Sequence, residues 1–281
     1  MDELKLHSHR FELKHAVRKG GNSVVFKAYH YDAGRYVRTC AVKLLSQLDE
    51  PRRDRFANEV EVQSALEHDR VATLYTHGEV VLPPVGEKIH LNEDVTVPWA
   101  AIGLGGKNLR ESVESEGPLP LPQLRVAIED IGAAIDHVHA RGFIHRDIKP
   151  ANFVWEMGKS RVMMIDFGIA KRFGDDVSGR PLDHFTKQME FVGPVFFSSP
   201  ELIAYAGDKD HPVDHRSDVF QLGKLAWYLA TGVVTGGVPA LRVDPTAGRL
   251  RDVILQIMSD DPSDRPSTAI EAMEAILDAV S

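Results

Sequence analysis

The 281-residue chain has a formal net charge of −8, with 43% hydrophobic and 26% charged residues, a composition typical of a globular protein. The acidic balance argues against general binding to nucleic acid or to anionic membranes. The single cysteine, Cys40, excludes an intramolecular disulfide and lies in an apolar stretch that predicts burial. No apolar run is long enough to span a membrane, and the first residues do not resemble a signal peptide, so we expect a soluble, cytoplasmic domain.

Strands are predicted in the first third of the chain, where β-branched and aromatic residues are interrupted by glycines. The predicted strands cover residues 11–17, 23–31, 36–45, 71–75 and 99–104. Between the third and the fourth strand, apolar residues from Phe56 to Leu66 form a rough stripe that predicts a helix over 53–67. This part of the chain is therefore expected to be a small β-rich lobe with one main helix.

The remainder of the chain predicts helices. Apolar residues from Leu124 to Val138 recur at helical spacing, and Gly142 ends that helix. Further helical patterns cover residues 216–231, 250–258 and 268–280. We therefore expect a larger helical lobe after the β-rich one, with the join near residues 103–106.

Three short motifs carry the chemistry. Residues His145 to Asn152 read HRDIKPAN, and a random chain of this length would match the pattern H-R-D-x-K-P-x-N about once in 10⁵ sequences. A DFG triplet begins at Asp166, directly after an apolar run, and an SPE triplet ends at Glu201, 35 residues later. Each short motif alone is a weak signal, but their order and spacing together make a chance match very improbable.

With these motifs, the chain resembles the Hanks-type protein kinases over residues 11–280, within their Ser/Thr branch. Casein-kinase-one-like features lie at residues 106–109, 152–153 and 165–171. The resemblance implies an α+β, bilobal fold: a small antiparallel β-rich N-lobe with one main helix (1–104) and a larger helical C-lobe (105–281). It also implies transfer of the γ-phosphate of ATP to serine or threonine hydroxyls of protein substrates, with autophosphorylation.

The resemblance assigns a role to each polar residue of the motifs. Asp147 is expected to orient the attacking hydroxyl and to accept its proton, with Lys149 as a cation near the γ-phosphate. Asn152 and Asp166 offer hard oxygen ligands suited to Mg²⁺, or to Mn²⁺ in its place. Phosphoryl transfer depends mainly on positioning and on stabilising negative charge, which is why these residue types are expected together.

Lys43 ends a predicted strand and is similar to the family's lysine that contacts the α- and β-phosphates of ATP. Its partner on the following helix is expected to be Glu59, with Glu61 as the alternative. One turn after Glu59, Gln63 stands where the family usually has an apolar residue, so either the packing under this helix is unusual or the register that selects Glu59 is wrong.

The loop that covers the phosphates is expected around Gly20, Gly21 and Ser23, because glycine lets the backbone approach a ligand closely. Arg18 and Ser23 stand where the family has its first and third glycines, and the glycine pair alone would also fit an ordinary hairpin turn. Three apolar residues are expected to contact the adenine: Val25, Ala41 and Val154.

Structural support and regulation are also implied by the resemblance. Asp218 is similar to the aspartate that anchors the catalytic loop, and Glu201 with Arg265 to the family's internal ion pair. Arg146 is typical of kinases controlled through the activation segment, where a phosphate or carboxylate neutralises the arginine. The candidate groups are Ser178, Thr186 and Glu190. Two alternatives stay open for Glu190: its carboxylate takes the place of a phosphate, or it is an ordinary solvated side chain.

Two departures from the family leave alternatives open. Pro194 stands where Ser/Thr kinases usually have threonine, and the prolines and glycines over 232–250 predict that the substrate-docking helix is shortened or absent. The main hypothesis is an active kinase with protein substrates, Mg²⁺ and ATP, and no nucleic acid partner. The alternatives are a pseudokinase that acts as a nucleotide-binding or protein-interaction module, and a small-molecule phosphotransferase on a related fold. Oligomeric state and substrate identity are not predicted.

Overall fold

The computed structural model describes residues 3–6, 8–19, 22–82, 95–158, 160–173 and 194–281. The chain forms two compact units, each with its own core. Unit 1 comprises Met1–Glu67 and Ala72–Gly105, and unit 2 comprises His68–Val71 and Gly106–Ser281. The short segment His68–Val71 thus packs with unit 2, although its neighbours in the chain on both sides belong to unit 1.

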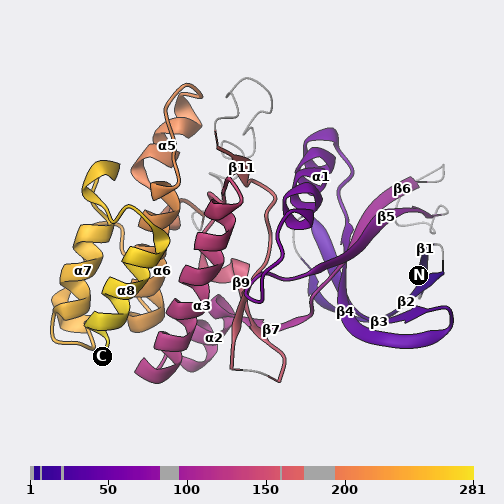
Figure 1. Cartoon of the computed structure of the whole chain (residues 1–281), viewed down its shortest axis with the longest axis horizontal. Helices are drawn as coiled ribbons and strands as arrows, with labels where there is room; N and C mark the ends of the chain where they lie inside the picture. Colours follow the sequence, from indigo (N-terminus) through magenta and orange to yellow (C-terminus); the bar gives the residue numbers. More distant parts are fainter. Residues whose placement is uncertain (1–2, 7, 20–21, 83–94, 159, 174–193) are drawn as a thin grey trace. The chain divides into compact units, whose positions relative to one another are not determined.

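Unit 1 contains a six-stranded antiparallel sheet in the order β1-β2-β3-β4-β6-β5 and, among the described residues, one helix (Figure 1). Its elements are β1 (Glu3–Leu6), β2 (His9–Lys19), β3 (Ser23–Asp32), β4 (Arg35–Leu45), α1 (Glu50–Ser64), β5 (Leu74–Leu82) and β6 (Val95–Ile102). This β-rich unit with one main helix confirms the predicted fold of the first part of the chain.

Strand β1 was not predicted from the sequence. Its four residues pair with β2, from Glu3 opposite Glu12 to Leu6 opposite His9. Leu4 is 1% exposed and belongs to the core of the unit. An alternation of this length is too short to be recognised as a strand from its pattern, and burial of Leu4 becomes visible only in the fold.

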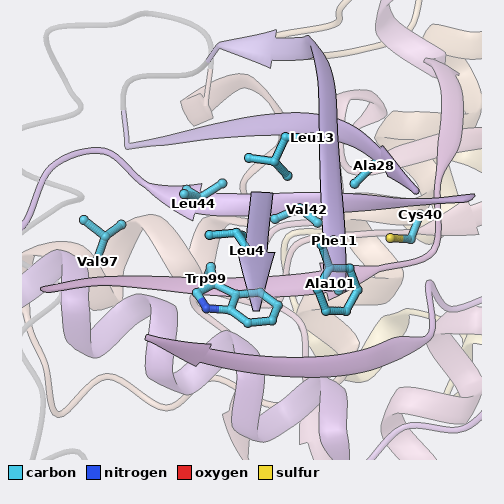
Figure 2. Packing of buried hydrophobic residues seen from close by; sticks show 10 residues of the cluster. All are labelled: Leu4, Phe11, Leu13, Ala28, Cys40, Val42, Leu44, Val97, Trp99 and Ala101. Carbon is cyan, nitrogen blue, oxygen red and sulfur yellow. The ribbon is translucent and has the colours of Figure 1, made fainter. Parts of the chain in front are cut away.

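The alternation of side chains along β4 divides the core of unit 1 between the two faces of the sheet. Cys40, Val42 and Leu44 point into one cluster, which Figure 2 shows around Trp99 of β6. The other members of this cluster are Leu4, Phe11, Leu13, Ala28, Val97 and Ala101. Burial raises the pKa of the Cys40 thiol to about 12, so this cysteine is a core residue, as predicted, and not a reactive one.

The second cluster joins the other face of the sheet to helix α1. Ala41 and Leu45 of β4 pack there with Phe56 of α1. Lys43 lies between Ala41 and Leu45 in the alternation of β4, so it projects on the same face as the helix. The alternation of β4 therefore directs the Lys43 side chain toward α1.

Helix α1 begins three residues before its predicted start. The Asp49 side chain accepts a hydrogen bond from the backbone N–H of Arg52, and Pro51 lies in the first turn, where its missing N–H costs nothing. The helix ends at Ser64, three residues before the predicted end. Its buried residues are Phe56, Glu59, Val62 and Gln63.

Unit 2 is mainly helical, and it carries a three-stranded sheet (β10-β9-β7) and a two-stranded one (β11-β8). Its strands are β7 (Gly105–Asn108), β8 (Phe143–Ile144), β9 (Phe153–Glu156), β10 (Val162–Met164) and β11 (Lys171–Arg172). Its helices are α2 (Leu109–Glu116), α3 (Leu121–Ala140), α5 (Pro200–Gly207), α6 (Arg216–Thr231), α7 (Arg249–Ile257) and α8 (Ala269–Ala279). The 3₁₀ turns are η1 (Pro150–Asn152), η2 (Pro194–Phe197), η3 (Leu241–Val243) and η4 (Pro262–Asp264).

The helices of unit 2 approach one another closely at two glycines. Helix α3 packs against α6 and α8, and α6 packs against α7 (Figure 1). A Cβ atom added to Gly132 of α3 would lie 2.7 Å from the side chain of Met273, and one added to Gly223 of α6 would lie 2.7 Å from that of Ile257. Side chains at these two positions would separate the helices, so glycine is needed there.

Between α6 and α7, the described chain holds the 3₁₀ turn η3 and no α-helix. The prolines and glycines of this segment predicted that outcome. Among all the helices that the structure describes, none is both long and apolar enough to cross a membrane.

Candidate active site

Lys43 and Glu59 form an ion pair inside unit 1. The Lys43 Nζ atom lies 2.6 Å from both carboxylate oxygens of Glu59, and the two side chains are 14% and 8% exposed. Strand β4 places Lys43 between Val25 of β3 and Ala100 of β6. Glu61, the alternative partner, is exposed on α1. Of the two glutamates, the structure therefore brings Glu59 to the lysine.

The residues expected around the nucleotide are only partly described. Val25 and Ala41 pack in the cluster on the helix-facing side of the sheet, and Ser23 begins β3 opposite Leu45. Gly20 and Gly21 lie outside the described residues. Val154 belongs to unit 2, where β9 buries it beside β10.

The end of the predicted phosphate loop is bonded to α1, a contact that the sequence did not reveal. The side-chain oxygen of Asn22 accepts a hydrogen bond of 2.9 Å from Arg52 Nε. The backbone oxygen of Asn22 accepts another of 2.9 Å from the N–H of Ser46. Asp49, which caps α1, forms an ion pair with the same arginine. The start of β3 is thereby fixed to the helix that carries Glu59.

In unit 2, Asp218 of α6 holds the backbone of the HRD motif. Its carboxylate accepts hydrogen bonds of 2.8 Å from the N–H groups of His145 and Arg146, and a third of 2.8 Å from His139 Nε2. Burial alone would raise the pKa of Asp218, but the hydrogen bond from His139 and the neighbouring donors outweigh burial and lower this pKa below its ordinary value. The aspartate is therefore a charged anchor inside the fold.

Gln221, one turn further along α6, holds the same loop from its other side. Its side-chain oxygen accepts from the N–H of Ile148 at 3.0 Å, and its nitrogen donates to the carbonyl of Arg146 at 3.3 Å. Arg146 has φ of +62°, a left-handed conformation that a non-glycine residue adopts at a cost. These bonds stabilise that conformation and fix the direction of the residue that follows, Asp147.

The carboxylate of Asp147 is oriented by two neighbours. Its Oδ2 atom accepts from Lys149 Nζ at 2.7 Å and from Asn152 Nδ2 at 2.9 Å, and Asn152 Nδ2 also donates to the Asp147 carbonyl at 2.8 Å. Among the described residues, the side-chain hydrogen bonds to this carboxylate all go to Oδ2. The Oδ1 atom is thereby left to accept a further proton.

Asp166 follows strand β10 in a left-handed conformation, with φ of +69°. Its Oδ1 accepts from the N–H of Gly168 at 3.2 Å. The N–H of Ile165 donates to the carbonyl of Asn152 at 2.8 Å, which places the two predicted metal ligands on adjacent segments. Phe167 is fully buried, with its ring centroid 5.2 Å from that of His145.

The predicted supporting ion pair is present and buried. Arg265 Nη1 lies 2.7 Å from Glu201 Oε1, and Arg265 Nη2 lies 2.9 Å from Oε2. The same guanidinium donates to the backbone carbonyls of Arg216, Ser259 and Asp260. The pair joins the start of α5 to η4 and α6.

Arg146 is buried, and within the described part of the chain its guanidinium contacts a backbone carbonyl and an aromatic ring. Its guanidinium donates to the carbonyl of Ile169 at 2.9 and 2.6 Å and lies 5.8 Å from the ring centroid of Tyr205. Burial lowers the pKa of Arg146 below its ordinary value. Ser178, Thr186 and Glu190 lie outside the described residues, so their link to Arg146 stays a prediction.

His145 gives the fold a testable dependence on pH. The ring is fully buried, and its Nδ1 atom accepts from the N–H of Asp147 at 3.2 Å. Burial lowers the pKa of His145 below its ordinary value of about 6.5. The unfolded chain therefore binds more protons than the folded one as the pH falls through about 6.5. The free energy of unfolding is expected to decrease in that direction.

The variant His145→Asn keeps an acceptor near the position of Nδ1 but cannot be protonated. Its free energy of unfolding is expected to fall less steeply than that of the wild type between about pH 7 and about pH 5, measured by urea unfolding. Some slope remains, because burial also lowers the pKa of His30 and His137. His77→Asn, at an exposed position of β5, serves as the control. Equal slopes for His145→Asn and wild type would contradict the prediction.

The family model of the protein kinase domain matches residues 11–235. The chain therefore belongs to the protein kinase domain family, and the predicted α+β kinase fold is confirmed.

Among curated relatives, the chain is 32% identical to the serine/threonine-protein kinase PknB of Mycobacterium tuberculosis, over 94% of this chain and 42% of the relative. It is 30% identical to a probable serine/threonine-protein kinase of Corynebacterium efficiens (97% and 41%) and 28% identical to one of Streptomyces coelicolor (99% and 41%). The chain spans about two fifths of the length of these relatives.

Proposed function

We propose that this domain transfers the γ-phosphate of ATP to serine and threonine hydroxyls of protein substrates, and to hydroxyls of its own chain. The observation that carries the proposal is the orientation of Asp147. Lys149 and Asn152 hold one carboxylate oxygen, and Asp218 and Gln221 fix the backbone around it. A carboxylate held in this way, with one oxygen left to accept a proton, is suited to general base catalysis.

In the proposed reaction, the substrate hydroxyl oxygen forms a bond to the γ-phosphorus while the bond from the γ-phosphorus to the β–γ bridging oxygen breaks. The hydroxyl proton passes to Asp147 Oδ1, and the products are a phosphoester and ADP. Lys149 Nζ, 2.7 Å from Oδ2, supplies positive charge beside the transferred group. Lys43 neutralises the α- and β-phosphates, and its bonds to Glu59 keep its ammonium group in place.

Asn152 and Asp166 fit the role of holding Mg²⁺. Among the described residues, the side-chain hydrogen bonds of Asn152 are made by its amide nitrogen, which leaves the amide oxygen as a ligand. Asp166 adds a carboxylate, and Mg²⁺ commonly takes one or two protein oxygens with phosphates and waters completing its shell. Bound there, the ion supplies charge neutralisation to the phosphates. We further propose that the reaction takes place in the cytoplasm, because its substrate is ATP.

The preference for serine and threonine rests on Lys149, which resembles the Ser/Thr branch, and on the names of the relatives. Pro194, at the usual threonine position, lies at the start of η2. Tyrosine phosphorylation is therefore the outcome that the experiment has to distinguish.

The test incubates purified chain with Mg²⁺ and γ-labelled ATP, alone and with casein as a generic substrate, followed by phosphoamino acid analysis. Label on phosphoserine and phosphothreonine is expected, with loss in a Lys43→Met control. ATP binding without transfer would favour the pseudokinase, and transfer to added small alcohols alone would favour a small-molecule phosphotransferase. Label confined to phosphotyrosine would reject the residue preference.

A further inference from the structure

Helix α1 is held within unit 1 by polar contacts as well as by apolar ones. Of its four buried residues, Phe56 and Val62 are apolar, whereas Glu59 and Gln63 are polar. A buried polar side chain is costly unless its hydrogen bonds are made. The position of this helix therefore depends on directional bonds as well as on apolar packing.

Gln63 makes one of these bonds at the end of the helix. Its side chain is buried, with 3% of the residue exposed, and its Nε2 atom donates to the carbonyl of Ala72 at 2.5 Å. Ala72 is itself fully buried. Gln63 lies four residues after Glu59, so the two side chains share one face of α1. The contact is thus one turn away from the Lys43–Glu59 pair.

The residues just before Ala72, Arg70 and Val71, are bonded to strand β10 and helix α3 of unit 2. The carbonyl of Arg70 accepts from the N–H of Met164 at 2.8 Å, and Val71 forms a parallel bridge with Met164. The Arg70 side chain also forms an ion pair with Asp130 of α3, whose other oxygen accepts from the N–H of Val162 at 2.8 Å. Within unit 1, Ala72 is fully buried, and the carbonyl of the next residue, Thr73, accepts from the N–H of Gly103 at 2.9 Å, so the Ala72 carbonyl is a fixed acceptor for the Gln63 side chain.

We propose that Gln63 is a positioning residue, whose hydrogen bond to the Ala72 carbonyl sets α1 along its axis and keeps the Glu59 carboxylate on Lys43. An apolar side chain would fill the same volume but would allow the helix to slide, because packing lacks the directionality of a hydrogen bond. One residue of a helix corresponds to about 1.5 Å along its axis, so a shift smaller than one residue would break the 2.6 Å contacts of Glu59. This inference rests on the proposed function of Lys43 and Glu59 in ATP use.

The test is a double-mutant cycle in the full chain. Gln63→Met has nearly the same shape without a donor, and it is expected to lower kcat/KM for ATP about tenfold. In a Glu59→Gln background the same change is expected to lower the remaining kcat/KM less than twofold, because Gln63 acts through Glu59. Ser64→Ala is the matched control. Its hydroxyl donates to the Val60 carbonyl on the exposed side of the same turn, and its loss should leave kcat/KM unchanged.

The cycle separates positioning from general stability. Equal losses in the two backgrounds, or no loss in the wild-type background, would overturn the inference. A Gln63→Met protein that no longer unfolds cooperatively in urea would also overturn it, since Gln63 would then support the fold as a whole. Absence of phosphotransfer by the wild type would instead reject the proposed function, and the inference with it.

Discussion

Replacing Asp147 with asparagine is expected to lower the rate of phosphotransfer about 10³-fold, within the range usual for loss of a general base. The amide oxygen can still accept from Lys149 Nζ and Asn152 Nδ2, so the side chain keeps its orientation. What is lost is the ability to take the proton of the attacking hydroxyl. The rate is measured with labelled ATP at saturating Mg²⁺, both on casein and on the chain itself.

Two measurements distinguish a loss of the chemical step from a loss of ATP binding or of stability. The Kd for ATP and the urea midpoint of Asp147→Asn are expected to stay close to wild type, since neither the shape nor the hydrogen bonds of the side chain change much. Asp278→Asn, an equal change of charge at an exposed position of α8, is expected to retain full activity. Activity of Asp147→Asn within tenfold of wild type would show that another group accepts the proton.

The elements with strong periodicity could be predicted from the sequence, whereas short or capped ones could not. The helix predicted over 216–231 spans Arg216–Thr231, because its apolar positions and the following glycine mark both ends. Strand β1 was not predicted, since its four residues show no more than a brief alternation. The start of α1 was placed too late, because the prediction followed apolar spacing and ignored the cap at Asp49 and the proline after it.

The candidate site was predictable where motifs are local. The structure brings Glu59 to Lys43, the partner that the resemblance implied. It also brings Lys149 and Asn152 to the carboxylate of Asp147, two contacts that the sequence analysis did not predict. The residues of neighbouring helices that form hydrogen bonds around the catalytic loop could not all be predicted from motifs. His139 and Gln221 carry no motif of their own, because a single polar residue on a helix has no local pattern that states its partner.

Gln63 was singled out by the sequence, but its role could not be predicted without the structure. The sequence marked it as a departure from the family, which left either unusual packing under α1 or a wrong register of Glu59 as the explanation. The structure supplies the reason that the pattern lacked: a buried carbonyl, that of Ala72, lies within reach of its amide. A polar residue at an apolar position can be interpreted only when its partner is known, and here the partner lies beyond the end of the helix.

The second large effect is expected for stability. Replacing Arg265 with methionine leaves the Glu201 carboxylate buried without its two bonds of 2.7 and 2.9 Å. Removing one partner of a buried ion pair costs about 3–5 kcal/mol, because the remaining charge is no longer compensated. The free energy of unfolding, measured in urea near pH 7 by circular dichroism, is therefore expected to fall by about that amount.

The double variant Glu201→Met with Arg265→Met separates the cost of the unpaired charge from the value of the pair. Without a buried charge, it is expected to be more stable than Arg265→Met alone. The recovery should be partial, because the carbonyls of Arg216, Ser259 and Asp260 still lose the guanidinium donor. A double variant no more stable than Arg265→Met would assign the whole effect to those backbone bonds. A loss below about 1 kcal/mol in Arg265→Met would indicate that water reaches Glu201, as at an exposed ion pair.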